Sequence, residues 1–386
     1  MADNHQRPKA TPRVASIDAL RGFDMFWIMG GGAVLTSLGS FIDHPIIDTL
    51  KVQLEHVEWE GFRFEDLIFP LFLFIVGAVL PFSLERRLDQ GFGKFRITWQ
   101  IFRRAVILVL LGFIIQGFLQ LDFANFRRDF ADFRLTGVLQ RIGVCYFFGA
   151  LIVLYFKTPV RVIFFAAILL LYWAALMFIP VPNAGGEGIA QAGVITAQGC
   201  LPSYIDQIIL GNHIHRQFYG FGDNEGLLST FPAIGTVLLG VFAGSWLKSP
   251  RGKAAKLFGL IFGGGAGVGL GYLWGLQFPI IKVIWTSSYV LFAGGWSLLL
   301  LAFFYLWIDV FHLKITLFFF LVIGMNPIFI FVVPRFIDFA KISDYFLGGV
   351  LPLAIGYEDF LTVLSVFAVK WLFLYFLYRH RIFFKV

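Results

Sequence analysis

The chain has 386 residues, of which 58% are hydrophobic and only 14% are charged. About a quarter of the residues of a soluble globular domain are charged, so this chain cannot present most of its surface to water. A net charge of +7 would suit nucleic-acid binding in a soluble protein, but here the excess of Lys and Arg lies in short loops. The composition therefore predicts a helical membrane protein with no nucleic-acid partner.

Uncharged runs of roughly 18 or more residues mark the expected spans, because the hydrocarbon core of a bilayer requires about 20 helical residues. Such runs occupy 25–42, 67–84, 105–121, 162–186, 227–247, 257–281, 283–308 and 315–334. Two further runs, 135–156 and 360–378, each contain one cation, Arg141 or Lys370. We therefore expect an all-α polytopic bundle of about ten transmembrane helices within one domain, 16–379.

The segment 336–358 is apolar in part but too short to cross, and it is rich in Gly and Pro, so we expect it to be re-entrant or interfacial. Lys and Arg concentrate in alternate loops, which predicts that those loops are cytoplasmic. On this basis the tails 1–15 and 380–386 are both cytoplasmic, and the main external loops are 41–65 and 180–226.

A dense group of ionisable side chains immediately precedes the second span. Residues 54–66 contain one imidazole, His56, together with five carboxylates. A histidine with a pKa near about 6.5 can take a proton from an amine or hydroxyl nucleophile, and a carboxylate such as Asp66 can fix its tautomer. The alternative is that His56 is an ordinary loop residue and Asp66 an N-cap of the second span.

Several polar groups lie within the apolar runs. Asp18, Arg21 and Asp24 follow one helical face, which could line a site or form a salt-bridged stripe that fixes the depth of the helix. Arg141 requires a partner inside its span. Asn326 precedes a helix-breaking proline, a pattern that suits either backbone lining a cavity or a hydrogen bond between helices.

The sequence offers little support for a metal site or a disulfide. His213 and His215 have no third ligand nearby in the sequence, and we therefore expect no metal. Cys145 lies in an apolar run and Cys200 in a polar loop, so the two thiols should lie at different depths. The six glycines between 263 and 271 lie inside a span, which favours close helix packing over nucleotide binding.

Six segments together resemble a known family. They are 16–24, the motif His56-x-x-Trp59-x-Gly61, 66–72, 137–142, 225–234 and 324–327. In these segments, which are spread over nearly the whole chain, the sequence resembles the heparan-alpha-glucosaminide N-acetyltransferase family of transmembrane acyltransferases. In length it is similar to bacterial members, including those linked to N-acetylglucosamine use, and this implies the bacterial inner membrane.

The resemblance implies transfer of an acetyl group from cytosolic acetyl-CoA to an amino sugar or sugar hydroxyl on the non-cytoplasmic side, with His56 as the catalytic residue. We expect Asp66 to orient His56, and the acyl donor to be the only cofactor. Candidate residues for acetyl-CoA are Arg21, Arg103, Arg104 and Arg141, of which the first three are equally suited to be positive-inside anchors. Candidate residues for the acceptor are Asp24, Trp59, Glu225 and Asn326.

Two other classes of function stay open at this stage. A transporter or flippase for a small sugar would also place Asp, Arg and Asn side chains along its path, although it needs no base at the external mouth. A membrane scaffold would not need so many polar groups in its spans. Besides membrane lipid, the expected protein partner is a second copy of the chain, because most oligomers are symmetric homodimers.

Overall fold

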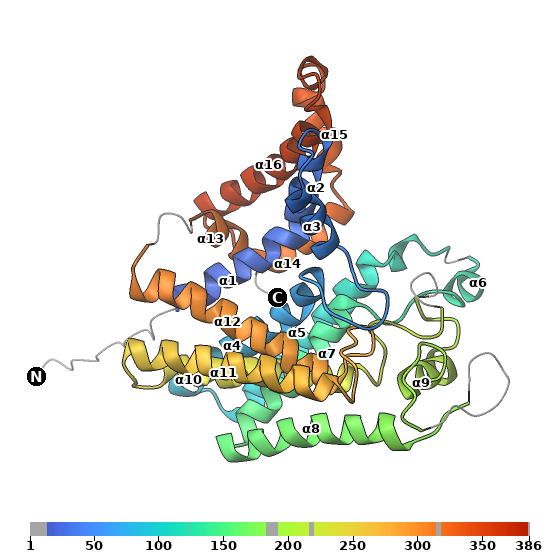
Figure 1. Ribbon diagram of the computed structural model, residues 1–386, viewed down its shortest axis with the longest axis vertical. Coiled ribbons are helices and arrows are strands. Elements are labelled where there is room, and N and C mark those ends of the chain that lie inside the picture. The colour runs from blue at the N-terminus through green and yellow to red at the C-terminus, as the bar shows by residue number, and fades with distance from the viewer. Residues whose placement is uncertain (1–13, 123, 183–191, 216–219, 314–317, 385–386) are drawn as a thin grey trace, which may run out of the picture.

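The computed structural model describes residues 14–122, 124–182, 192–215, 220–313 and 318–384 (Figure 1). Most of the expected tail 1–15, two stretches of the loop 180–226 and the start of the span 315–334 therefore lie outside the described residues. All the elements of the described chain are helices, and the predicted all-α polytopic membrane bundle is confirmed.

Eight helices are long and apolar enough to cross a membrane. They are α4 (Glu65–Asp89), α5 (Lys94–Ile115), α7 (Val138–Tyr155), α8 (Thr158–Phe178), α10 (Thr230–Lys248), α11 (Lys253–Gly275), α12 with η4 (Ser287–Val310) and α16 (Glu358–Arg379). The helices α13 (Phe318–Gly324) and α14 with η6 (Pro327–Arg335) meet at an angle of 75° and form a ninth span if they are counted together. The described chain thus has eight or nine such spans, where we expected about ten.

The difference lies in the first apolar run, which is not one helix. The chain forms α1 (Ala15–Phe26), the π-helical η1 (Trp27–Gly31) and α2 (Gly32–Ser37). Gly30 breaks the run at φ 122°, a conformation that glycine adopts without the steric cost of a Cβ atom. The ammonium of Lys370 on α16 donates to the carbonyl of Met29 at 2.8 Å, so the cation within the apolar run 360–378 satisfies a backbone group at the break.

The helices α4 and α10 pack backbone to backbone in the middle of the bundle. A Cβ atom on Gly77 would lie 1.9 Å from the carbonyl oxygen of Val237, and one on Gly240 would lie 1.9 Å from that of Phe74. Helices in a membrane associate largely through such close packing of small residues. The packing fixes α4, whose first turn carries Asp66, within the protein interior.

The segment 336–358 contains α15 (Phe339–Leu347), which lies against α16 at one tip of the molecule (Figure 1). The side chain of Asp338 caps α15 by accepting hydrogen bonds from the amides of Ala340 and Lys341. At about 1.5 Å per residue, a helix of 9 residues cannot cross the hydrocarbon core alone. This geometry agrees with the expected re-entrant or interfacial segment.

Candidate active site

A tight turn places His56 next to the first turn of α4. The chain leaves α3 (Pro45–Gln53) and passes through Gly61 at φ 125°. One carboxylate oxygen of Asp66 accepts the amides of Val57 at 3.4 Å and Arg63 at 3.0 Å, and it thereby orders the turn. The role of Asp66 in ordering the start of α4 and a role in orienting His56 are therefore compatible.

The other oxygen of Asp66 faces the imidazole. His56 Nδ1 lies 3.1 Å from Asp66 Oδ1, which agrees with the predicted pair. The side chain of Asp66 is only 1% exposed, whereas that of His56 is 46% exposed. The carboxylate is thus a buried anchor for a ring that stays accessible to small molecules.

Lys282 completes this group, and sequence reasoning missed it. Its ammonium lies 3.0 Å from His56 Nδ1 and 3.2 Å from Asp66 Oδ1. Burial lowers the pKa of Lys282 from its ordinary value, although the Asp66 carboxylate opposes this effect. The available signal was a single Lys between two long apolar runs, at the end opposite to the Arg-rich loops.

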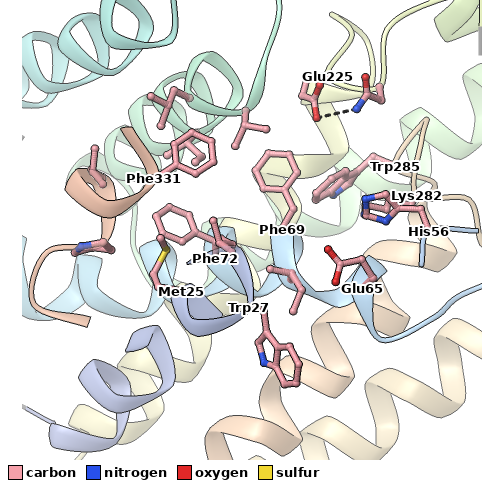
Figure 2. A pocket seen from close by; sticks show the side chains of 18 of the residues that line it. Met25, Trp27, His56, Glu65, Phe69, Phe72, Glu225, Lys282, Trp285 and Phe331 are labelled. Atoms are coloured by element: carbon pink, nitrogen blue, oxygen red, sulfur yellow. Dashed lines mark hydrogen bonds between the residues drawn. The ribbon is translucent and has the colours of Figure 1, made fainter. Parts of the chain in front are cut away.

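A cavity of about 400 Å³ opens beside His56 (Figure 2). Its polar lining consists of His56, Glu65, Asn224, Glu225 and Lys282, while Phe69, Phe72 and Trp285 contribute apolar walls. An apolar pocket with a few convergent polar groups is the usual form of a small-molecule site. We call it the His56 cavity.

A second cavity of about 460 Å³ lies next to the first, on the side of the arginines. Its cationic lining consists of Arg21, Arg86, Arg87 and Arg104. Four residues line both cavities: Phe72, Ile142, Pro327 and Ile328. The arginine cavity and the His56 cavity are therefore separated by no more than one layer of side chains.

The four arginines that were expected to bind acetyl-CoA do not lie at one site. Arg21 and Arg104 line the arginine cavity, but Arg103 is exposed and does not. Arg141 is 2% exposed and lies over the ring of Trp285, 5.0 Å from its centroid. Its guanidinium donates to Ser229, and Arg141 lines neither cavity.

The four residues that were expected to bind the acceptor do not lie at one site either. Glu225 lines the His56 cavity, and the indole nitrogen of Trp59 donates to the carbonyl of Ile195 at 3.1 Å, which joins two loops. Asp24 is completely buried, lines neither cavity, and has no hydrogen-bond partner for its carboxylate among the described residues.

Asn326 binds the end of the chain. Its amide nitrogen donates to the carbonyl of Ile382 at 3.0 Å, and its amide oxygen accepts the N–H of Phe384 at 2.9 Å. Phe384 stacks on Phe329 and forms part of the wall of the arginine cavity. Asn326 thus acts on that cavity through the tail it holds.

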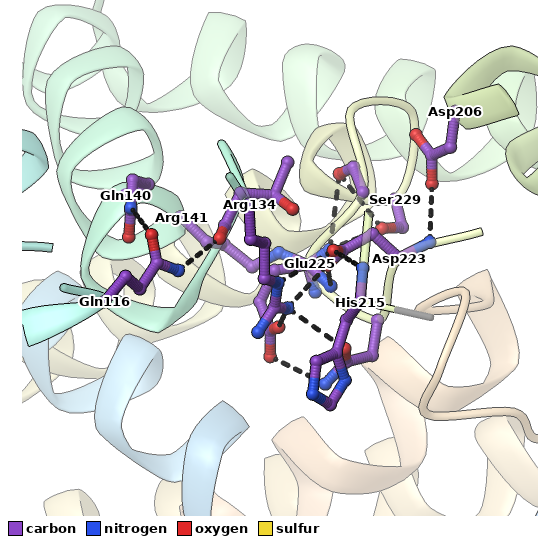
Figure 3. A network of polar contacts seen from close by, with 12 residues as sticks. Gln116, Arg134, Gln140, Arg141, Asp206, His215, Asp223, Glu225 and Ser229 are labelled. Carbon is purple, nitrogen blue, oxygen red and sulfur yellow. Dashed lines mark hydrogen bonds and ion pairs between the residues drawn. The ribbon is translucent and has the colours of Figure 1, made fainter. Parts of the chain in front are cut away.

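A buried ionic network supports Glu225 (Figure 3). Arg134 Nε donates to Asp223 Oδ2 at 2.8 Å, and its Nη2 donates to Asp223 and Glu225. Burial alone would raise the pKa of Asp223, but Arg134 brings it below the usual range. Burial raises the pKa of Asp206, which accepts the amides of Leu227 and Asp223, from 3.8 to about 6.

The described residues contain no cluster of three or more potential metal ligands. His213 Nδ1 bonds to the carbonyl of Phe133 at 2.6 Å, and the backbone amide of His215 donates to Asp223. The two histidines of the sequence motif therefore support loop structure.

The sequence is similar to known proteins over much of its length. A family described as a domain of unknown function (DUF5009) matches residues 13–119. Human heparan-alpha-glucosaminide N-acetyltransferase is 27% identical over 429 aligned residues, which cover 97% of this chain and 60% of the human protein. The mouse protein of the same name is 29% identical over 326 residues, covering 72% of this chain and 48% of its own length. The chain thus spans about half to three fifths of these relatives.

Proposed function

Because the chain belongs to the family of heparan-alpha-glucosaminide N-acetyltransferase, we propose that it is a transmembrane acetyltransferase that transfers the acetyl group of acetyl-CoA to an amino sugar or sugar hydroxyl. The observation that carries the proposal is the pair of adjoining cavities, with arginines along one and His56 with Asp66 in the other. This arrangement matches a donor with an anionic head and a reactive thioester at the far end of a flexible arm.

The arginine cavity fits the nucleotide part of acetyl-CoA. Guanidinium groups bind phosphates through paired, charge-assisted hydrogen bonds, and Arg21, Arg86, Arg87 and Arg104 provide four of them. The apolar layer between the cavities fits the uncharged arm, which would pass Phe72 to reach the other side. In this proposal the thioester carbon lies in the His56 cavity.

The chemistry requires a base for the acceptor. His56 Nε2 takes a proton from the acceptor nitrogen or oxygen as that atom attacks the thioester carbonyl. The carbon–sulfur bond then breaks, the acetyl group stays on the acceptor, and the proton on Nε2 passes to the departing sulfur as CoA leaves as a thiol. Direct transfer through a ternary complex gives sequential kinetics, whereas an acetyl-imidazole intermediate would give ping-pong kinetics.

The orientation of the protein is part of the proposal. The Arg-rich loops favour a cytoplasmic arginine cavity and an external His56 cavity. The resemblance to bacterial members of the family favours the inner membrane of a bacterium. The assignment of 16–379 as one acyltransferase domain, with both tails in the cytoplasm, follows from the same loops. A homodimer stays a prediction.

Orientation is tested by chemical labelling. Val57→Cys in a protein without Cys145 and Cys200 places one thiol next to His56. An impermeant thiol reagent added to intact cells should label it. Labelling only after the cells are opened would contradict the proposed orientation.

A sugar transporter is the competing function, since two adjoining cavities could also serve a transport path. Incubation of the purified protein with acetyl-CoA and glucosamine separates the two. An acetyltransferase releases free thiol and N-acetylglucosamine in equal amounts, whereas a transporter releases neither.

Two neighbouring arginines test the donor site. Arg104 lines the arginine cavity and Arg103 does not. Arg104→Gln removes a charge-assisted bond worth about 1.5 to 3 kcal/mol, so the KM for acetyl-CoA should rise about 10- to 100-fold. Arg103→Gln serves as the matched control and should change this KM less than about threefold. Equal effects of the two substitutions would remove the arginine cavity from donor binding.

A further inference from the structure

Lys282 is held in place by a turn with an unusual backbone. The amide of Trp285 closes the turn on the carbonyl of Lys282 at 3.0 Å, and Trp285 has φ 56°, which is rare for a bulky residue. The indole of Trp285 donates to Thr236 Oγ1 at 3.1 Å, and its ring lies under Arg141. Backbone strain of this kind persists only where surrounding contacts impose it, often at functional sites.

The same turn is bonded to the loop that carries His56. The amide of Gly61 donates to the carbonyl of Ile280 at 2.9 Å, two residues before Lys282. The hydroxyl of Tyr289, at the start of α12, donates to the carbonyl of Asp66 at 2.7 Å. Lys282 and His56 are thus positioned by one connected structure, although 226 residues separate them in the sequence.

One nitrogen of His56 has two competing partners. In a neutral ring, Nδ1 carries either a proton or a lone pair. The Asp66 carboxylate, 3.1 Å away, only accepts, so it requires a proton on Nδ1 and leaves Nε2 free to act as a base. A charged Lys282, 3.0 Å away, only donates, so it requires the lone pair on Nδ1 and places the ring proton on Nε2.

We propose that Lys282 is a positioning residue that sets the tautomer of His56, and this inference rests on the proposed acetyl transfer. While Lys282 is charged, it holds the ring with its proton on Nε2, where the ring cannot accept the proton of the acceptor. When Lys282 releases one proton to solvent, the ring stays neutral and its own proton moves by exchange with water from Nε2 to Nδ1. Asp66 then binds Nδ1–H, and Nε2 becomes the base.

The carboxylates around Lys282 favour its charged form. Burial lowers the pKa of Lys282 from 10.5, whereas the carboxylates of Asp66, Glu65 and Glu225 oppose that shift. Glu65 and Glu225 line the same cavity, so they face Lys282 from α4 and from the loop before α10. Outside the cavity, Arg63 donates to the carbonyl of His56 at 3.3 Å and pairs with Glu55 at 3.6 Å.

The dependence of kcat/KM on pH tests the proposal. In the wild type the rising limb should report the loss of the Lys282 proton and lie above the ordinary imidazole pKa of about 6.5. Lys282→Met removes the competing donor, so the limb should move to lower pH, toward that of the imidazole. Lys341→Met, at a side chain that is 85% exposed on α15, is the control and should leave the profile unchanged.

An arginine at the same position sharpens the test. A guanidinium stays charged throughout the usable pH range, so Lys282→Arg should keep the ring proton on Nε2 and hold kcat/KM about 100-fold or more below the wild-type maximum at every pH. If Lys282 were only a counter-charge for Asp66, Lys282→Arg would stay active. In that case Lys282→Met would move the limb to higher pH, because the unpaired carboxylate would favour the imidazolium. Either result would overturn the proposal.

Nitrogen NMR of ¹⁵N-histidine-labelled protein reads the tautomer directly, without turnover and without a substitution at Lys282. The His56 signal, assigned by its loss in His56→Gln, should show the proton on Nε2 at neutral pH and on Nδ1 at high pH. A ring that keeps its proton on one nitrogen across this range would contradict the proposal, even if the Lys282 variants failed to fold. The proposed acetyl transfer fails separately, if wild-type protein with the expected tautomer change releases no thiol from acetyl-CoA.

Discussion

Replacing Asp66 by Asn removes one charge and almost no volume from the candidate active site. Asp66 Oδ2 accepts the amides of Val57 and Arg63, while Oδ1 accepts from the ammonium of Lys282 and lies 3.1 Å from His56 Nδ1. The asparagine oxygen should turn toward the amides of Val57 and Arg63, because buried N–H groups require an acceptor. Its NH₂ group then faces His56 Nδ1 and donates to it.

At the pH of maximal wild-type turnover, where the proposal has Lys282 neutral and the proton of His56 on Nδ1, the consequence of Asp66→Asn is a reversed tautomer. A donor at Nδ1 holds the ring proton on Nε2, so His56 loses its basic nitrogen on the cavity side. The lost charge-assisted bond is worth about 1.5 to 3 kcal/mol, and recovery of the active tautomer would break a neutral hydrogen bond worth about 0.5 to 1.5 kcal/mol. Together these amount to about 2 to 4.5 kcal/mol, so turnover should fall about 30- to 2000-fold.

Thiol release from acetyl-CoA in the presence of glucosamine is the assay, with purified variants in the same detergent. Asp48→Asn is the matched control, because Asp48 is an exposed carboxylate on the neighbouring α3 whose salt bridge to Lys51 spans 3.7 Å. The control should keep wild-type turnover, and both variants should bind acetyl-CoA normally. Turnover of Asp66→Asn within about threefold of the wild type would refute the proposed orienting role.

Three further predictions concern the scaffold around the site. Because burial raises the pKa of Asp206 from 3.8 to about 6, the protonated form stabilises the fold below pH 3.8, and this contribution, at most about 3 kcal/mol, is lost as the pH rises through 6. Asp206→Asn should therefore flatten the pH dependence of thermal unfolding between pH 5 and 7.5, and an unchanged slope would contradict this. Asn326→Leu should release the tail 382–384 and raise the KM for acetyl-CoA severalfold at unchanged kcat, and unchanged kinetics would show that the tail does not shape the donor cavity. Gly240→Ala forces a Cβ atom to within 1.9 Å of a backbone oxygen of α4 and should lower the unfolding temperature. Gly269→Ala is the control, because a Cβ atom there lies within 4 Å of no other group in the described chain. Equal unfolding temperatures of the two variants would refute the packing argument.

The sequence predicted those parts of the structure that depend on composition and on neighbouring residues. Long apolar runs identified most of the spans, because the thickness of the hydrocarbon core requires their length. The pairing of His56 with Asp66 was predictable because the two residues are only ten positions apart and the loop that carries His56 leads directly into the helix that carries the carboxylate. Arg21 and Arg104 line the arginine cavity and Glu225 lines the His56 cavity, while the binding roles expected for them stay predictions.

Features that depend on distant contacts were not predictable from the sequence. Lys282 reaches His56 only through the packing of α12 on α4, so its charge looked like an isolated interruption between two spans. Asn326 was expected either to line a substrate cavity or to form a hydrogen bond between helices, and its hydrogen bonds to the tail, made across 56 and 58 residues, could not be read from the sequence. The break in the first span required both the left-handed conformation of Gly30 and Lys370 on the last helix.

The central claim, acetyl transfer across the membrane by His56, is tested most directly in sealed proteoliposomes. Radiolabelled acetyl-CoA is added outside vesicles that contain glucosamine, so that only molecules with an outward arginine cavity receive the donor. Wild-type protein should accumulate labelled N-acetylglucosamine inside the vesicles. The His56→Ala variant should bind acetyl-CoA with an unchanged Kd and form product at least about 100-fold more slowly. Transfer by His56→Ala at near wild-type rates, or product formation only when both substrates are on the same side, would contradict the account.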